Sequence, residues 1–244
     1  MTTPAVLNTG DPGSSWNLWK HLAAGRPEFG NPNAFCGDID KTKWESFTVT
    51  TSDPKFAEVF EQFTHQEVGR GGLMTFKDSK WMMTVDAFHN PVYQGQSKDN
   101  YVWWGYGLFP DNQGDYVQKK MADCTGEEIL TEAFSHLHLD QPTIESLIKN
   151  SSCRMAMMPY ITSQFMPRAK GDRPDVIPKG STNLAFLGQY CEMPDDTVFT
   201  VEYSVRSAME AVYHLMDVDK SAPPVYKGQH HPGVLYEALK ATLK

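Results

Sequence analysis

Three runs rich in β-branched and aromatic residues follow one another in the middle of the chain, and they limit its fold more than any other feature. They are LMTFK at 73–77, WMMTVDAF at 81–88 and YVWWGYGLF at 101–109. A turn-like DS pair separates the first two, and the polar stretch NPVYQGQSKDN separates the second from the third. Strands joined in this way most simply pair as an antiparallel meander. The sequence therefore predicts an antiparallel sheet.

Segments on both sides of these runs show helix or strand patterns of their own. ESFTVTT at 45–51 alternates like a half-buried strand. SDPKFAEVFEQF has Asp53 as a helix cap and Pro54 at the first helical position, and Thr125 three residues before Glu128 forms a capping box. After an irregular opening, further helices are predicted in SSWNLWKHLAA, PTIESLIKN, the segment from about 200 to 216, and GVLYEALKATL. The elements together predict an α+β or α/β fold.

Composition excludes several classes of function. With 244 residues, 40% of them apolar, the chain is long enough for one large domain or two small ones. A formal net charge of −8 argues against nucleic acid as a partner, because that affinity comes largely from clustered Lys and Arg. No apolar run is long enough to span a bilayer, and the start MTTPAVLNTG lacks the features of a signal peptide. We expect a cytoplasmic location.

The cysteines and histidines do not predict a metal site. Cys36, Cys124, Cys153 and Cys191 form no CxxC pair, so a zinc ribbon and a thioredoxin-like motif are both excluded, and buried, reduced thiols are expected. His136 and His138 would point to different faces of a helix and could not share a metal ion there.

The stretch from residue 184 to the following helix has the outline of a ligand site. LAFL at 184–187 is a continuous apolar run, typical of a strand buried on both faces of a parallel sheet. Gly188 ends the run where backbone can approach a ligand, and the helix beginning near Thr200 offers free amides and a positive dipole end. Most units of this kind bind nothing, however, and GxGxxG, GxSxG, HExxH and P-loop motifs are absent. The residues alone indicate an α+β protein, or the end of a nucleotide-binding domain.

The proline-rich segment before this stretch leaves two alternatives open for several residues. The methionines fit either the lining of an acyl tunnel or the packing of a core. The cations are suited to meeting a phosphate or carboxylate, or are simply solvated. The residues in question are Met155, Met157, Met158, Arg168, Lys170 and Arg173.

Three long strings resemble the C-terminal half of the oleate hydratase family, also called myosin-cross-reactive antigens. They are YGLFPDNQGDYVQKKMADCTGEEILTE, MMPYITSQFMPRAKGDRPDVIPKGSTNLAFLGQ and DDTVFTVEYSVRSAMEAVY. The resemblance extends from GSSWNLW to YKGQHHPGVLYEALK, nearly the whole chain. It implies an FAD-dependent hydro-lyase that adds water to the cis-9 double bond of oleic and related acids, giving 10-hydroxy fatty acids.

The resemblance also implies a domain plan and a set of site residues. Residues 1–180 would be part of the substrate domain, 181–216 the closing strand, loop and helix of the FAD domain, and 217–244 a helical tail. Cofactor contacts are implied for Gly188, Gln189, Phe199, Thr200 and Ser204, the first two near the pyrophosphate or ribityl chain and the others beside the flavin ring. Thr162, Ser163 and Gln164 would face the flavin and substrate channel; the alternative is a buried strand with satisfied hydroxyl groups.

The chain departs from the family pattern in two respects. Family members are more than twice as long, and their first half carries the GxGxxG unit together with the acid and the tyrosine assigned to catalysis. Met1 therefore looks like an internal start, in a split gene or a truncation, and no catalytic residue is expected here. Several relatives hold the fatty-acid carboxylate with a Thr-x-Asn-x-x-x-His pattern, whose matching positions are Asp86, Phe88 and Val92. His89 or Asn90 would have to substitute, unless both are ordinary sheet surface.

Partners follow from the same resemblance. An oleate-like fatty acid is the implied substrate, relatives commonly form homodimers, and the tail at 226–244 either rests on an anionic membrane surface or packs as a plain helix. We expect the chain alone not to hydrate oleate. The alternatives are a flavin-binding or fatty-acid-binding fragment without activity, a subunit that complements a separately encoded N-terminal half, or an unrelated flavin oxidoreductase fragment.

Overall fold

The computed structural model describes residues 15–243, which form parts of two compact units. One unit spans residues 38–162, and the other combines the chain up to residue 37 with residues 163–244. The irregular opening expected before the first helix lies outside the described residues. The domain boundaries implied by the resemblance concern the longer relatives and stay a prediction.

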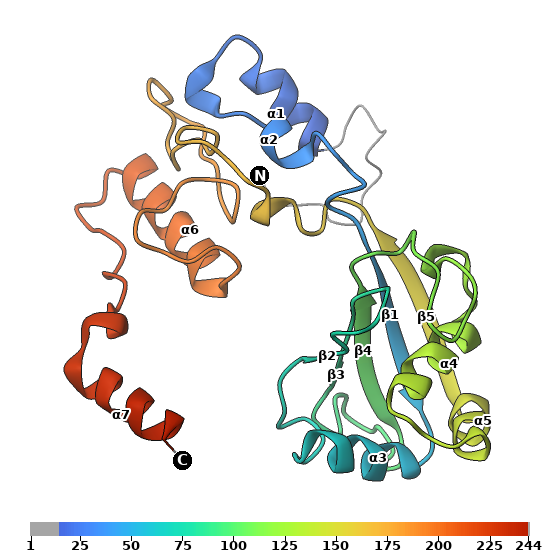
Figure 1. The fold of residues 1–244 in the computed structure, drawn as a ribbon. Coiled ribbons are helices and arrows are strands. Elements are labelled where there is room, and N and C mark those ends of the chain that lie inside the picture. Colours follow the sequence, from blue (N-terminus) through green and yellow to red (C-terminus); the bar gives the residue numbers. More distant parts are fainter. Residues whose placement is uncertain (1–14, 244) are drawn as a thin grey trace. The chain divides into compact units, whose positions relative to one another are not determined.

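The first unit, called the sheet unit here, is built on five antiparallel strands in the order β2-β3-β4-β1-β5 (Figure 1). Strands β2, β3 and β4 form the predicted meander, and β1 is the strand predicted before them. The bounds are β1 Trp44–Thr51, β2 Met74–Thr75, β3 Met83–Ala87, β4 Tyr101–Gly107 and β5 Ser151–Met158. Only β5 was not predicted. It lies at the sheet edge with half-buried or exposed side chains, so neither alternation nor an apolar run marks it in the sequence.

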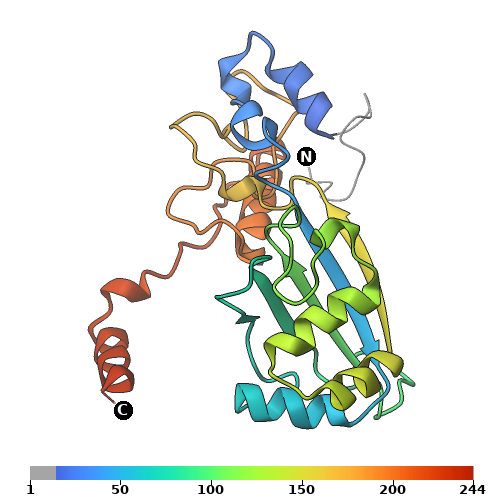
Figure 2. The ribbon, with the colours of Figure 1, turned by 45° about the vertical axis from the view of Figure 1, so that its right-hand side comes forward.

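Three helices cover one face of this sheet: α3 (Lys55–Thr64), α4 (Gly126–His136) and α5 (Gln141–Lys149) (Figure 2). The core between them contains Phe47, Val49, Trp103, Leu130 and Phe134, all almost fully buried. Phe47 lies opposite Gly105, where any side chain would overlap the Phe47 ring. The sheet and its helices therefore make one continuous apolar core within the unit.

The capping box predicted for α4 is present, whereas the N-cap of α3 is Pro54, one residue after the predicted cap Asp53. Thr125 and Glu128 form the capping box at the start of α4, in which each side chain accepts a hydrogen bond from the other residue's backbone N–H. Asp53 Oδ1 accepts a hydrogen bond from the backbone N–H of Lys55 at 2.9 Å, at the start of α3. The short polar sequences before both helices therefore set their first residues.

The second unit, called the helical unit here, contains α1 (Ser15–Ala23), α2 (Asn33–Cys36), α6 (Val201–Leu215) and α7 (Pro232–Thr242). Trp19, Phe35, Phe186 and Tyr190 form a small aromatic core with ring centroids 5.6–6.2 Å apart. The helices predicted at α1, α6 and α7 are confirmed. Short 3-10 turns at Pro27–Phe29, Ser163–Phe165 and Gly228–His230 complete the unit, and Met121–Asp123 is a further one in the sheet unit.

The strand predicted at 184–187 is wrong for this structure. The segment has no regular secondary structure and belongs to no sheet. Its backbone link is the Phe186 N–H, which donates to the carbonyl of Val176 at 2.8 Å, while the Phe186 side chain joins the aromatic core. A segment of this kind becomes a strand only when neighbouring strands pair with it, and the described residues of the helical unit contain none.

Two further expectations can be compared with the structure. All four cysteines are free thiols, three of them buried and Cys153 half-buried. Across residues 15–243, no helix is both long and apolar enough to cross a bilayer.

Candidate functional site

A loop and a helix meet at Gly188 in the helical unit. Gly188 has a φ of +84°, a backbone conformation that favours glycine. Its N–H donates to Ser207 Oγ at 2.9 Å, and a Cβ placed on it would find only Ser204 Oγ within 4 Å, at 3.9 Å. The residue is therefore held against the second turn of α6, while the space where its side chain would lie stays open.

The start of α6 carries three of the implied cofactor contacts. Thr200 is its N-cap: Oγ1 accepts the N–H of Tyr203 at 3.2 Å and donates to the carbonyl of Thr197 at 2.9 Å. The remaining first-turn amides have no acceptor inside the helix, as at any helix start. Phe199, at a φ of +87°, exposes 62% of its surface, and Ser204 lies one turn further along. Gly188, Thr200 and Ser204 are thus brought to one end of the same helix.

The apolar side of α6 faces away from the core of its unit. The buried residues of the helix are Tyr203, Ser207 and Ala211, and the Tyr203 hydroxyl donates to the carbonyl of Cys191 at 2.6 Å. The aliphatic stripe is exposed instead: Val201 by 76%, Val205 by 52%, Val212 by 54% and Met216 by 70%. A surface of this kind is typical of a helix that packs against something outside the described chain.

Gln164 and Gln189 lie near this helix and differ in whether their side-chain oxygen atoms accept a hydrogen bond. The Gln164 carbonyl accepts a hydrogen bond from Arg173 at 2.8 Å, and its Oε1 accepts one from the Tyr190 hydroxyl at 3.3 Å. Gln189 Oε1 is buried with no hydrogen-bond partner among the described residues. A buried, unpaired acceptor is uncommon and calls for a donor that is not yet present.

The implied substrate residues are distributed over both units. Thr162 ends the sheet unit, where its N–H and Oγ1 both donate to the carbonyl of Thr42. Ser163 and Gln164 are buried in the helical unit. His89 is exposed, and Asn90 is tied to Gln96 and Lys98 by its side-chain amide. A purely structural role would explain every hydrogen bond observed for Thr162 and Asn90.

The positions matching the carboxylate pattern lie at the end of β3. Asp86 pairs with Trp104 across the strands, on the sheet face opposite the helices, and burial raises the pKa of its carboxyl. Phe88 and Val92 are both more than a third exposed. None of the three offers a hydrogen-bond donor or positive charge to a carboxylate, in agreement with the doubt raised by the sequence.

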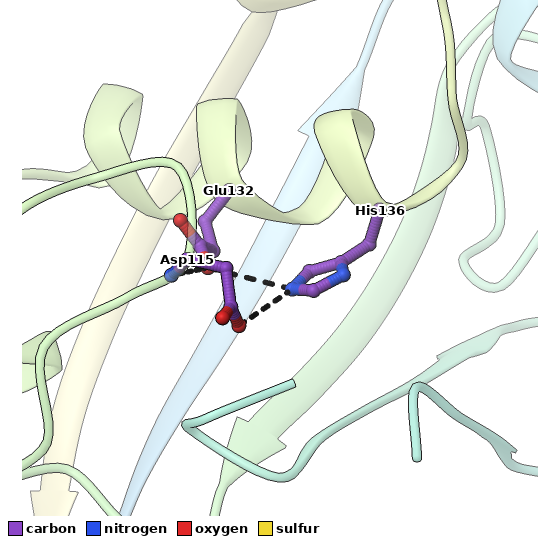
Figure 3. A group of neighbouring side chains, drawn as sticks. All are labelled: Asp115, Glu132 and His136. Carbon is purple, nitrogen blue, oxygen red and sulfur yellow. Dashed lines mark hydrogen bonds and ion pairs between the residues drawn. The ribbon is translucent and has the colours of Figure 1, made fainter. Parts of the chain in front are cut away.

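A cluster that the sequence did not predict joins Asp115, Glu132 and His136 in the sheet unit (Figure 3). One ligand atom from each lies within 4.8 Å of the others. His136 Nε2 is 3.4 Å from Glu132 Oε1 and 3.6 Å from Asp115 Oδ2. The signal available in the sequence was the spacing of four between Glu132 and His136, which places both on one face of α4.

The bonds of this cluster favour a structural role over a metal site. Glu132 is fully buried, and its carboxylate accepts the backbone N–H groups of Asp115, Tyr116 and Val117 at 2.7–2.9 Å. Lys80 Nζ lies 3.2 Å from Asp115 and supplies the positive charge a metal ion would otherwise bring. Burial alone would raise the pKa of Glu132, but its bonds to His136 and these amides lower it. The cluster therefore fastens the 115–117 loop to α4.

Comparison with known proteins adds a family and two relatives. The model of the MCRA family matches residues 1–213. An oleate hydratase from Streptococcus pyogenes serotype M49 (strain NZ131) is 42% identical over 238 residues, which cover 94% of this chain and 40% of the relative. A linoleate hydratase from Lactiplantibacillus plantarum is 33% identical over 235 residues, which cover 88% of this chain and 41% of that relative. The chain thus spans about two fifths of the length of these curated relatives.

Proposed function

The chain belongs to the MCRA family, and from that premise we propose that it is the C-terminal part of an FAD-dependent fatty acid hydratase. Its two relatives are named for hydration of oleate and of linoleate, both cis-unsaturated fatty acids. The proposed reaction adds water to the cis-9 double bond of an oleate-like acid and gives a 10-hydroxy acid. Because the relatives are more than twice as long, the proposed activity requires the polypeptide that this chain does not span.

The open space at Gly188 beside α6 is the observation that carries the cofactor part of the proposal. The residue combines a positive φ with free space on the side where a Cβ would project. This geometry allows a ligand to approach the backbone closely. The amides at the start of α6 lie on the same helix as Ser204 and favour an electron-rich edge such as the pyrimidine carbonyl of a flavin.

The residues around this space fit a flavin in two further ways. Gln189 has a buried oxygen without a donor, which a hydroxyl group of a ribityl chain can supply. Phe199 and Val201 are exposed beside the helix start and offer an apolar surface to a planar ring. Glu202 in the first turn carries a negative charge, so the site favours a ring edge over a phosphate.

The residues of this chain would bind and orient, and would not transfer protons. Gly188, Gln189, Phe199, Thr200 and Ser204 are proposed to hold the cofactor. Hydration leaves the oxidation level of the substrate and water taken together unchanged, so the flavin supplies charge and position when bound, without net electron transfer. The acid and the base are proposed to come from the remaining polypeptide. Thr162, Ser163 and Gln164 are proposed to face the flavin and substrate channel, and His89 or Asn90 to hold the fatty-acid carboxylate.

The proposal is tested by complementation. The purified chain is incubated with FAD and oleate, alone and after co-expression with the remaining three fifths of the Streptococcus pyogenes relative, and 10-hydroxystearate is measured by mass spectrometry. We expect no product from the chain alone, and product together with bound flavin from the pair. Turnover by the chain alone would contradict the division of labour proposed here.

The same experiment separates the other functions considered. Bound flavin or fatty acid without turnover in any combination would favour a binding fragment, and turnover with a nicotinamide donor would favour an oxidoreductase. We also propose that the assembled protein is a homodimer. The tail would contact a membrane through α7, in which Leu235 and Leu239 are exposed by 54% and 58%. Vesicle co-sedimentation with and without residues 232–244 tests that contact.

A further inference from the structure

The loop that carries Arg168 and Lys170 is held in a defined shape. Asp172 accepts the N–H of Ala169 on Oδ2 at 2.6 Å and the side-chain amide of Asn31 on Oδ1 at 3.2 Å. Its carbonyl accepts the N–H of Asn31 at 2.8 Å. Gly171 turns the chain at a φ of +92° and has no atom within 4 Å of the position of a Cβ. Hydrogen bonds to Asp172 therefore hold the loop in place, and the space beside Gly171 is free.

Arg173 follows this loop and carries a buried charge without a carboxylate partner. Only 3% of the residue is exposed. Nη1 donates to the Tyr203 hydroxyl at 3.2 Å and Nη2 to the Gln164 carbonyl at 2.8 Å, while Nε has no partner among the described residues. No carboxylate of the described chain lies within ion-pair distance of the guanidinium, and burial lowers its pKa. A buried cation of this kind is costly unless an anion compensates it.

A cavity of about 570 Å³ opens beside Arg173 in the helical unit. Arg168 and Lys170 also line it, and neither makes an ion pair with any residue from 15 to 243. Asp175 and Glu192 line the same cavity, so its walls bear three positive and two negative side chains. The three positive residues come from one short loop, 168–173, so this loop supplies all the cations of the cavity wall.

We propose that this cavity binds an oxyanion, with Arg168, Lys170 and Arg173 supplying the donors. Two guanidinium groups and an ammonium group match the oxygen atoms of a phosphate or a carboxylate. The anion would compensate the buried charge of Arg173, whose guanidinium otherwise lies over the rings of Phe35 and Tyr203, 5.6 and 5.9 Å from their centroids. Asp175 and Glu192 are then free to accept hydroxyl groups of the same ligand. The site does not depend on the proposed hydratase activity.

Titration calorimetry of the purified chain with sodium pyrophosphate and with sodium malonate, at constant ionic strength, tests the site. Arg168→Gln/Lys170→Gln removes both exposed cations, which make no hydrogen bond in the structure and can be changed without disturbing the core. We expect at least a tenfold weaker affinity for the anion in this double variant. Lys179→Gln, also exposed but not lining the cavity, is the matched control and should bind as the parent chain does.

The two anions distinguish the source of the charge. Binding of pyrophosphate alone would assign the cavity to a phosphoryl group, binding of malonate alone to a carboxylate, and binding of both to either source. The proposal fails if neither anion binds above the sodium chloride blank. It also fails if the double variant and Lys179→Gln bind equally well. Arg173→Lys, which retains the charge and loses the fork of donors, should weaken binding as well, and its circular dichroism spectrum reports whether it is folded.

Discussion

The sheet unit and the helical unit bury their apolar residues to very different degrees. In the sheet unit the apolar side chains of β1, β3 and β4 that face the three helices are almost fully buried, whereas Trp44, Trp104 and Tyr106 on the opposite face are half-buried. In the helical unit α6 turns its valines outward, and α7 has no buried residue. Burial of apolar surface is the dominant stabilising term in folding. The sheet unit therefore has the core of an independent fold, whereas the helical unit presents surfaces that need a partner.

The largest effect that could break this comparison comes from Trp103 in the sheet unit. Its indole Nε1 donates to Thr51 Oγ1 at 3.0 Å, and its rings contact Phe56 and Phe134. Trp103→Ala should lower the free energy of unfolding by about 3–5 kcal/mol, because it leaves a cavity in the core and removes the hydrogen bond to Thr51, whose hydroxyl keeps its bond to Ser151. Urea unfolding followed by circular dichroism measures this loss. Tyr93→Ala, at a position 66% exposed, is the control and should change stability by less than about 0.5 kcal/mol.

The next largest effect on stability is expected at Glu132, and the free energy that this residue contributes should decrease at acid pH. Because its pKa is lowered in the folded chain, its contribution to stability is present above the ordinary value of 4.5 and is lost as the pH falls below it. Glu132→Gln should cost about 3 kcal/mol at pH 7 and flatten this acid-side decline. Unfolding curves from pH 7 to pH 3.5 test both parts. Glu127→Gln, exposed on the same helix, should leave the decline in place.

Glu45 should make the sheet unit less stable as the pH rises, the opposite of the pH dependence expected from Glu132. Burial raises the pKa of its carboxyl from 4.5 to about 7. As the pH rises, the carboxyl loses its proton near pH 4.5 in the unfolded chain but only near pH 7 in the folded chain. The free energy of unfolding should therefore fall between pH 4.5 and pH 7, and the total loss should reach about 3 kcal/mol above pH 7. Glu45→Gln should remove the fall and raise stability at pH 8. A variant as pH-sensitive as the parent chain would assign the effect to another group, and the exposed Glu145→Gln serves as the control.

The smallest effect is expected on the exposed side of α6. Val205→Ser and Val212→Ser should change stability by less than about 0.5 kcal/mol, because both side chains already contact water. They should nevertheless reduce the binding of a hydrophobic dye such as anilinonaphthalene sulfonate. Ala211→Ser, on the buried face of the same helix, should cost more stability and leave dye binding unchanged. If the valine variants and Ala211→Ser lowered stability equally, the valine side chains of α6 would be buried against another surface, which would contradict the comparison.

The difference between the units also explains which features could be predicted from sequence. In the sheet unit the meander, the capping box at Thr125 and the helix at 55–64 follow from local patterns that agree with the packing. The strand prediction at 184–187 failed because the described residues of the helical unit contain no strand that could pair with this segment. Edge strand β5 and the contacts of Glu132 could not be predicted for another reason. The side chains of β5 are half-buried or exposed without alternation, and Glu132 bonds to a loop distant in sequence, so neither feature leaves a local periodicity.

The candidate site was predictable only in outline. The helix start at Thr200 and the glycine turn at Gly188 were expected from residue types, and the structure joins the turn to the same helix through the hydrogen bond from the Gly188 N–H to Ser207 Oγ at 2.9 Å. The unpaired Nε of Arg173 and the unpaired oxygen of Gln189 could not be expected, because satisfaction of a polar group depends on the whole set of neighbours.

Hydrogen exchange of the intact chain, followed by mass spectrometry, tests most directly the claim that only the sheet unit is complete by itself. Amides of β1, β4 and α4 should exchange only through large-scale unfolding, whereas those of α6 and α7 should exchange orders of magnitude faster. Protection of α6 should rise towards that of β1 when the remaining polypeptide of the relative and FAD are present. Equal protection of α6 and β1 in the chain alone would contradict the account.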